Sequence, residues 1–295
     1  MDLKVNQNQK RIDKFLTEET DYSRNMIQKM IESGFILING KVPKANYIVK
    51  EGEIITINED YKEETKVEAE DIPLDIVFED ADLMVINKPS GMVVHPGSGN
   101  NSGTLVNALM GLDMDLSDDE VRPGIVHRID KDTTGLILVA KNNKTHELLS
   151  EMFKNKTINR EYIALLSGEF KTNTATIDAP IGRDARDRKR MNVTDKNAKE
   201  AVTHLIVIKR YKGYTLVRLS LETGRTHQIR VHMKYIGFPV HNDPVYTKKE
   251  SDEFGQFLHS EKLTFIHPIT KEKMSFIQEL PKEFSEYINN LTEIE

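Results

Sequence analysis

The N-terminal part of the chain has apolar positions at a spacing that predicts two short helices followed by short strands. Four apolar residues between Met26 and Ile31 fall on one face of a helix, and Ser23 precedes them as a suitable N-cap. A β-rich apolar run then leads into Asn39-Gly40, a strong signal for a tight hairpin turn. We therefore expect a compact helix–helix–hairpin domain over residues 10–58.

Residues 59–71 carry mainly acidic side chains, a composition typical of a linker. Beyond the linker, short apolar runs separated by turns predict strands, at 83–86, 135–140, 162–166, 201–208 and 214–221. The segment 144–154 has the apolar spacing of an amphipathic helix. Strand runs joined by short turns favour a mixed, largely antiparallel sheet. We expect an α+β fold, with one large domain over residues 72–295.

The composition excludes several classes of protein. None of the 295 residues is cysteine, which excludes disulfide scaffolds, thiolate zinc sites, iron–sulfur clusters and cysteine nucleophiles. No apolar run approaches the ~18 residues of a membrane-spanning helix, and the N-terminus lacks the apolar core of a signal peptide. We therefore expect a cytoplasmic protein without a membrane partner.

The charge of the chain is distributed unevenly. The formal net charge is −6, yet residues 179–250 contain 16 Lys/Arg and only 7 Asp/Glu. This segment is therefore strongly basic and the rest of the chain strongly acidic. Such segregation indicates a basic surface suited to a polyanion such as nucleic acid, although a merely solvated surface has the same composition.

The common phosphate-binding, nucleophile and zinc motifs are not matched. The run 34–41 has one residue too many for a P-loop, and the run 97–103 misses the dinucleotide fingerprint by one position. Ser98 lacks the surroundings of a nucleophile elbow. His227 and His232 lie five residues apart, not the four that place two zinc ligands on one helical face. We therefore expect neither a cofactor nor a metal ion.

Two charged segments interrupt otherwise apolar surroundings. Asp130 precedes a buried strand, where its carboxylate must meet a cation or stay solvated. A second segment offers that cation in Arg225, which precedes a helix with Thr226 as the expected N-cap. An arginine beside a carboxylate keeps it ionised and oriented, as a carboxylate nucleophile requires. Each segment taken alone more often marks a turn held by a buried salt bridge.

The N-terminal domain resembles the S4-type RNA-binding domain in three segments, RIDKFL, SRNMIQKMIESGFILINGKV and EGEIITI. The resemblance implies that Arg24, Lys29 and Lys41 contact RNA. From the residues alone, a small helix–hairpin packing module remains the alternative.

The larger domain resembles a family of RNA-modifying enzymes. Its segments VHRIDKDTTGLILVAKN and LSLETGRTHQIRVHM are similar to the two characteristic motifs of RNA pseudouridine synthases of the RluA/RluD type. Further matching segments, among them INKPSGMVVHPGSGNNSGTLVNAL, REYIALLSG and GQFLHSEKLTFIHP, follow in the family's order between Asp75 and Pro281. The resemblance implies a pseudouridine synthase domain, which isomerises uridine in RNA so that a C5–C1′ bond replaces the N1–C1′ bond.

The resemblance also assigns roles to single residues. Asp130 matches the catalytic aspartate that acts at ribose C1′, Tyr162 the tyrosine that packs on uracil, and Arg225 the arginine that pairs with the aspartate. Arg128 corresponds to a residue inserted into RNA beside the flipped base. The other RNA contacts that it implies are His127, Thr134, Arg183, Lys189, Arg190, His227, Gln228 and Arg230.

The pattern over the whole length is most similar to the RluD branch, whose members modify large-subunit ribosomal RNA. We therefore expect a monomeric enzyme that acts on uridines of ribosomal RNA or of a pre-ribosomal particle. Two alternatives are a transfer-RNA pseudouridine synthase and a catalytically inactive RNA-binding assembly factor. A nucleoside hydrolase is disfavoured, because a free nucleoside needs neither the RNA-binding domain nor the basic surface.

Overall fold

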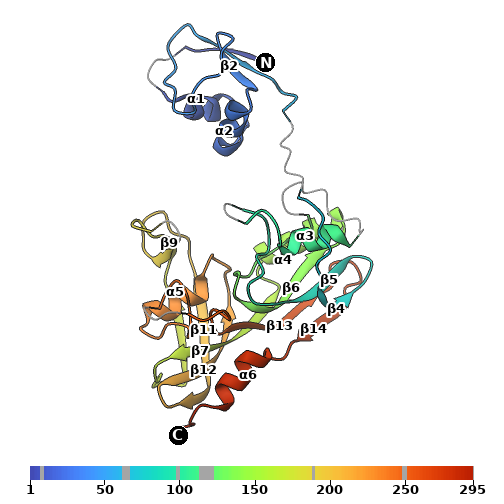
Figure 1. The fold of residues 1–295 in the computed structure, drawn as a ribbon, viewed down its shortest axis with the longest axis vertical. Coiled ribbons are helices and arrows are strands. Elements are labelled where there is room, and N and C mark those ends of the chain that lie inside the picture. Colours follow the sequence, from blue (N-terminus) through green and yellow to red (C-terminus); the bar gives the residue numbers. More distant parts are fainter. Residues whose placement is uncertain are drawn as a thin grey trace. The chain divides into compact units, whose positions relative to one another are not determined.

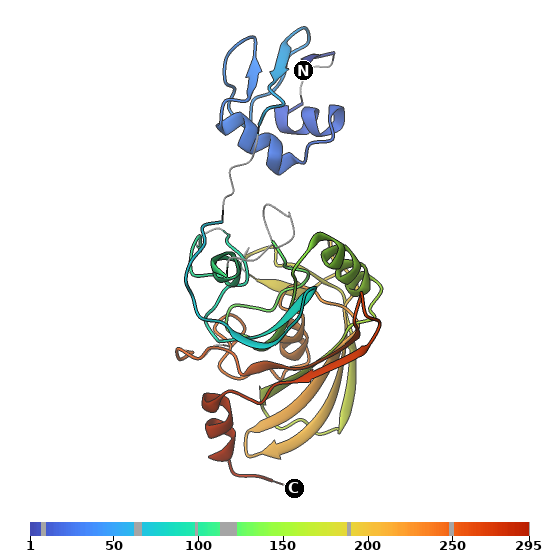
Figure 2. The same ribbon diagram turned by 90° about the vertical axis from the view of Figure 1, so that its right-hand side faces the viewer.

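The computed structural model forms two compact units, residues Met1–Thr65 and Lys66–Glu295 (Figures 1 and 2). The structure describes residues 1–6, 10–61, 67–97, 100–112, 123–187, 190–247 and 251–294. Within these ranges, no helix has the length and apolar character needed to span a bilayer.

The smaller unit packs two helices, α1 (Ile12–Glu19) and α2 (Arg24–Glu32), against a three-stranded antiparallel sheet. The strand order is β1 (Asp2–Lys4), β3 (Ile54–Ile57) and β2 (Ile36–Ile38). Ser23 caps α2 as predicted, because its hydroxyl accepts a hydrogen bond from the Met26 amide.

Asn39 and Gly40 form the predicted turn after β2, with φ angles of 48° and 78°. Such positive φ values are what a two-residue hairpin turn requires at both central positions. After the turn, an isolated bridge joins Ile38 to Lys41, and the strand that pairs with β2 along its length is β3.

The larger unit is built on a nine-stranded sheet in which β6 and β13 run parallel and the other described pairs run antiparallel. The strand order is β4 (Asp75–Glu79), β5 (Leu83–Lys88), β6 (Thr134–Ala140), β13 (Leu258–Ile266), β7 (Asn159–Ser167), β12 (Tyr214–Leu221), β11 (Val202–Tyr211) and β8 (Thr174–Asp178), and β14 (Lys273–Ile277) pairs with β13. A separate antiparallel pair consists of β9 (Ile181–Arg183) and β10 (Met191–Val193). This is the mixed, mostly antiparallel α+β architecture that the sequence predicts.

Alternate residues of the central strands enter hydrophobic cores on opposite faces of the sheet. On β6, for example, Ile137 and Val139 pack on one face, and Leu136 and Leu138 on the other. The first face carries α3 (Leu105–Gly111) and α5 (Gln228–Tyr235). The second carries α4 (Asn143–Lys154) and α6 (Lys282–Asn289).

The acidic segment 59–71 is divided between the two units. The Glu68 carbonyl accepts a hydrogen bond from the Asn107 side chain, and the Glu70 carboxylate accepts one from the Gly103 amide. Residues 67–71 are therefore attached to the start of α3 in the larger unit.

Candidate active site

Asp130 lies in the loop that enters β6, close to the N-terminal turn of α5. Its Oδ2 accepts a hydrogen bond from Nη1 of Arg230 at 2.9 Å, and its Oδ1 lies 3.9 Å from Nε2 of His227. The Asp130 side chain keeps 17% of its surface exposed, compared with 4% for Arg230. The carboxylate is therefore held from inside the protein while part of it stays accessible.

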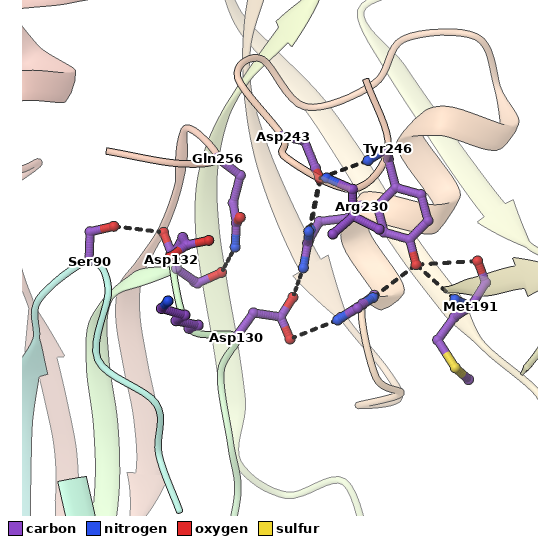
Figure 3. A network of polar contacts seen from close by, with 12 residues as sticks. Ser90, Asp130, Asp132, Met191, Arg230, Asp243, Tyr246 and Gln256 are labelled. Atoms are coloured by element: carbon purple, nitrogen blue, oxygen red, sulfur yellow. Dashed lines mark hydrogen bonds and ion pairs between the residues drawn. The ribbon is translucent and has the colours of Figure 1, made fainter. Parts of the chain in front are cut away.

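Arg230 is held in turn by a second carboxylate, that of Asp243 (Figure 3). Its Nε and Nη2 donate to the two Asp243 oxygens at 2.7 and 2.8 Å, a bidentate geometry that fixes the plane of a guanidinium. Asp243 also accepts hydrogen bonds from the backbone amides of Val245 and Tyr246. The loop after α5 therefore orients Arg230, and Arg230 orients Asp130.

The charges around Asp130 keep it ionised. Burial alone raises the pKa of Asp130, but the charges of Arg230 and Arg128, the neighbouring His227 and the hydrogen bond from Arg230 together bring it below its usual value. An ionised, oriented and accessible carboxylate can attack an electrophilic carbon or stabilise positive charge that develops there.

Asp130 lines two hollows, of about 330 and about 300 Å³. Tyr162 of β7 lines the larger one with it, and the exposed Arg128 lines both. Tyr162 is buried, and burial raises its pKa, so its phenol stays neutral. A flat ring that enters the larger hollow would meet Tyr162 and Asp130 together.

The structure corrects the predicted arginine partner of Asp130. Arg225 was expected to pair with Asp130, but its Nε donates to the Glu200 carbonyl at 2.9 Å and it lies at the wall of the larger hollow. Arg230, which was expected to contact RNA, is buried and makes the ion pair instead. The reason is that Arg225 lies in the turn before α5, whereas Arg230 lies in the helix and points inward.

The start of α5 also differs from the expectation. The N-cap is His227 rather than Thr226, and His227 has a left-handed φ of 56°. In this conformation its Nδ1 is hydrogen-bonded to the Tyr246 hydroxyl at 2.9 Å. That hydroxyl accepts a further hydrogen bond from the Met191 amide at 2.9 Å, which ties β10 to the site (Figure 3).

Three residues that were expected to contact RNA make hydrogen bonds within the protein, and two of them, His127 and Gln228, also line the larger hollow. The Gln228 amide is used fully, by the Thr223 hydroxyl, the Arg225 amide, the Val202 carbonyl and the Thr203 hydroxyl. The buried Thr134 hydroxyl is bonded to Nδ1 of His259 at 2.8 Å. His127 accepts a hydrogen bond from the Leu138 amide at Nε2, and burial lowers its pKa to about 3.

The other predicted RNA contacts lie nearer the surface. Arg183, at the end of β9, is exposed, and Nε of the partly exposed Arg190 lies 3.5 Å from the Asp187 carboxylate. Lys189 lies outside the described residues. In the smaller unit, Lys41 is exposed and Lys29 is half-buried, whereas Arg24 forms an ion pair with the buried Asp13 at 2.7 Å.

Lys88 is a supporting residue that the sequence reasoning missed. Its side chain is fully buried, and Nζ donates to the carbonyls of Pro89, Met92 and Lys131 at 2.7, 2.9 and 2.8 Å. Burial lowers the pKa of Lys88 to about 7, against the opposing effects of Asp132 and Asp130. Three carbonyl acceptors match the three N–H groups of the ammonium form. Lys88 therefore clamps the backbone next to Asp130, and a lysine within the apolar run VINKPSG was the available signal.

One group of described residues, Asp80, Asp82 and His267, has donor atoms close enough to share a metal ion. These atoms are already used inside the protein, because Asp80 accepts from the amides of Asp82 and Leu83 and from Nε2 of His267. The cluster therefore closes the β4–β5 turn.

Comparisons with known proteins show which family the chain resembles. Residues 82–235 match the family model described as RNA pseudouridylate synthase, and residues 10–55 match that of the S4 domain. The RNA pseudouridine synthase YlyB of Bacillus subtilis is 50% identical over 276 residues, which cover 92% of this chain and 91% of that one. Ribosomal large subunit pseudouridine synthase D of Escherichia coli K12 is 44% identical over 284 residues, which cover 90% of this chain and 86% of that one.

The fold is shared with the solved structure of human RNA pseudouridylate synthase domain containing 1. The TM-score is 0.59 at 23% identity, with 79% of this chain and 100% of that chain covered. Two relatives that span nearly the whole chain and a family model that includes Asp130, Tyr162 and Arg230 lead to one conclusion. The chain belongs to the RNA pseudouridylate synthase family and is an RNA pseudouridine synthase with an N-terminal S4 domain.

Proposed function

We propose that this enzyme converts specific uridines of large-subunit ribosomal RNA into pseudouridine, with Asp130 acting at C1′ of a flipped-out uridine. The observation that carries the mechanism is the ionised Asp130 carboxylate, which Arg230 holds at the wall of the hollow that Tyr162 also lines. The ribosomal substrate is supported by the Escherichia coli relative, whose name gives the large ribosomal subunit.

The target uridine has to leave its stack before Asp130 can reach it, because C1′ and the base are covered in stacked RNA. Arg128 is exposed and lines both hollows, so it is placed to fill the gap that the extruded base leaves. The extruded uracil packs on Tyr162 in the larger hollow, with its C1′ towards Asp130.

The reaction exchanges two bonds at C1′. The N1–C1′ bond breaks as the Asp130 carboxylate bonds to C1′ or stabilises its positive charge, and the uracil then turns so that C5 attacks C1′. One proton is lost from C5 and one is gained at N1, so the product is an isomer of the substrate. Arg230 keeps the carboxylate ionised and aimed throughout.

We assign RNA binding to the S4 domain, residues 10–58, and catalysis to the domain over 72–295, with the segment 59–71 between them, of which residues 67–71 pack on the larger unit. The match of the S4 family model to residues 10–55 supports the first assignment, and the basic segment 179–250 provides a second surface for RNA on the larger unit. We further propose that the enzyme works as a monomer in the cytoplasm, on ribosomal RNA or a pre-ribosomal particle.

The variant Asp130→Asn tests the mechanism, because it keeps the shape of the side chain and removes its charge. It should bind RNA and unfold at the normal temperature but form no pseudouridine. Asp132→Asn, two residues along the same loop and away from the larger hollow, is the matched control and should retain turnover. Substantial pseudouridine formation by Asp130→Asn would remove Asp130 from the mechanism.

The substrate is tested by deleting the gene and mapping pseudouridine across all cellular RNA. We expect pseudouridines to disappear from large-subunit ribosomal RNA. A loss confined to transfer RNA would overturn the ribosomal assignment and leave the enzyme class intact.

A further inference from the structure

Arg160 is a buried cation that has no role in the proposed reaction as described for Asp130, Tyr162 and Arg230. It lies on β7 two residues before Tyr162, so both side chains project from the same face of the strand and line the larger hollow. The exposed fraction of Arg160 is only 8%. In the described part of the chain no carboxylate pairs with it, and its buried Nε has no hydrogen-bond partner.

An unpaired buried guanidinium nitrogen is costly, and a catalytic role is one of the reasons for which proteins retain such a group. Arg230, on the same hollow, shows the contrast, because two carboxylates hold it. Among the described residues, Arg160 makes a cation–π contact with Phe153 and packs against Gly224. Its Cζ lies 5.3 Å from the centre of the Phe153 ring, and a Cβ on Gly224 would lie 2.9 Å from its Nη1.

The charges that line the larger hollow favour an anion. Asp130 is the one carboxylate among its lining residues, and Arg230 already compensates it. The further cations of the lining are Arg128, Lys154, Arg160 and Arg225. A group that becomes negative inside this hollow would therefore be stabilised, most strongly by the cation that is least hydrated.

We infer that Arg160 donates hydrogen bonds to the carbonyl oxygens of the flipped uracil and stabilises the negative charge that appears on it as the N1–C1′ bond breaks. This inference rests on the proposed function. The bonding pair of N1–C1′ passes to N1 and spreads over O2 and O4, while a carboxylate oxygen of Asp130 takes the vacated place at C1′. When C5 attacks C1′, the carboxylate leaves, C5 loses its proton and N1 gains one. Arg160 is then a catalytic residue, because it contacts the leaving group.

The position of Arg160 favours the base over a backbone phosphate as its partner. It shares a strand face with Tyr162, on which the base packs, and it is buried. Lys154, at the rim of the same hollow, is exposed and therefore better placed for a phosphate. The two cations should accordingly affect different steps.

The first test compares Arg160→Met with the matched variant Lys154→Met in the full-length enzyme. Single-turnover rates at saturating RNA and dissociation constants are measured for both. Arg160→Met should lower the rate about 100-fold, as does the loss of one preorganised donor to a developing anion, with the dissociation constant changed less than about threefold. Lys154→Met should raise the dissociation constant and leave the rate at saturation close to normal. The opposite pattern for Arg160→Met, weaker binding at a normal rate, would assign Arg160 to a phosphate and overturn the inference.

The second test changes the leaving group. Fluorine at C5 withdraws electrons, so 5-fluorouracil leaves as an anion more readily than uracil. The rate loss of Arg160→Met for breaking the N1–C1′ bond should therefore be smaller with 5-fluorouridine RNA than with uridine RNA. An equal loss on both substrates would overturn the inference.

A third test separates this role from a structural one. Because Met removes an unpaired buried charge, the melting temperature of Arg160→Met should stay the same or rise, whereas the loss of an arginine with a structural role would lower it.

Gly224→Ala gives a second variant, because its φ lies outside the left-handed region and the added Cβ displaces the guanidinium tip of Arg160 without removing its charge. It should also slow the reaction at an unchanged melting temperature. A lower melting temperature of Arg160→Met would overturn the inference. Activity in Asp130→Asn would instead overturn the proposed function.

Discussion

Asp130 and Asp243 bind opposite sides of one guanidinium group, that of Arg230 (Figure 3). Asp243 is fully buried and takes two of the three hydrogen bonds, so it sets the position of the arginine. Asp130 takes the third and keeps part of its surface open to substrate. Asp243, which lines neither hollow, thus determines where the Asp130 carboxylate lies.

Asp243→Asn should impair both stability and catalysis, because an amide nitrogen cannot accept the Arg230 hydrogen bond and leaves a buried charge without its main partner. We expect the free energy of unfolding in urea to fall by about 3 kcal/mol and the single-turnover rate to fall at least tenfold. Glu286→Gln, which removes an exposed ion pair on α6, is the control and should cost less than about 0.5 kcal/mol. Normal activity in Asp243→Asn would show that Arg230 needs no second carboxylate.

Lys88→Met keeps an unbranched side chain, one atom shorter, but leaves three buried carbonyls without a donor. The free energy of unfolding should fall by about 2–4 kcal/mol, since each carbonyl loses a charge-assisted hydrogen bond. Because one of them belongs to Lys131, next to Asp130, the rate at saturating RNA should fall more than the affinity does. A variant that is destabilised but fully active would limit Lys88 to a role in stability.

Acid should destabilise the enzyme through histidines whose pKa burial lowers, namely His127, His227, His232 and His259, and most strongly through His127 and His259. Burial lowers the pKa of His127 to about 3 and that of His259 to about 4, while the unfolded chain binds protons near pH 6.5. Below pH 6.5 the unfolded state therefore holds more protons, and stability falls as the pH falls towards these folded-state values. Urea unfolding at pH 7.5 and 5.0 should show a loss of about 2 kcal/mol per histidine.

His127→Gln should remove about 2 kcal/mol of this loss, because its amide oxygen can still accept from the Leu138 amide and does not titrate. A loss that is the same in the variant and in the unchanged protein would assign the effect to other groups.

Removal of residues 1–65 should weaken RNA binding at least tenfold while the rate at saturating RNA stays close to normal. The larger unit has its own core, and the proposed catalytic residues all lie within it. For the full-length protein, a plot of the logarithm of the association constant against the logarithm of the salt concentration should have a slope of about −0.7 for each neutralised phosphate. The slope for the truncated protein should be shallower. Equal slopes would show that the S4 domain makes no phosphate contacts.

The choice of the first residue matters in that experiment. A chain that starts at Ile72 lacks the hydrogen bonds of Glu68 and Glu70 to the start of α3. It should therefore melt at a lower temperature than a chain that starts at Lys66. Identical melting temperatures would mean that these contacts add nothing to stability.

Elements with a strong local pattern could be predicted from the sequence. The strand at 214–221 and the helix at 144–154 are observed almost to the residue, because their apolar spacing records which face is buried. The three-residue strands β9 and β10 could not be predicted, since their pairing depends on a hairpin held by the Tyr246 hydroxyl. A short strand whose stability comes from tertiary contacts has little local signal.

The same distinction applies to the site. Asp130 could be found because a charge just before a buried strand is unusual. The sequence could not show which arginine pairs with Asp130, because Arg225 and Arg230 lie in the same motif. His227 lies between them in a left-handed conformation, so the chain turns there and the two side chains point in different directions. The hydrogen bonds of Gln228 could not be predicted for a similar reason, since only the tertiary structure shows which groups its amide meets.

The parallel pairing of β6 with β13 has a consequence for the order of events during synthesis. The loop that carries Asp130 is secured by a hydrogen bond between Thr134 and His259 and by one that the Gln256 amide donates to the Thr133 hydroxyl, and these pairs are 125 and 123 positions apart. Gly135 lets β13 approach at this point, where a side chain would collide with the Ser260 carbonyl. A nascent chain therefore has an S4 domain able to fold early, but its catalytic loop lacks its supports until the last part of the chain has emerged. The S4 domain can therefore fold before the loop that carries Asp130 is in place, and only the finished polypeptide has both.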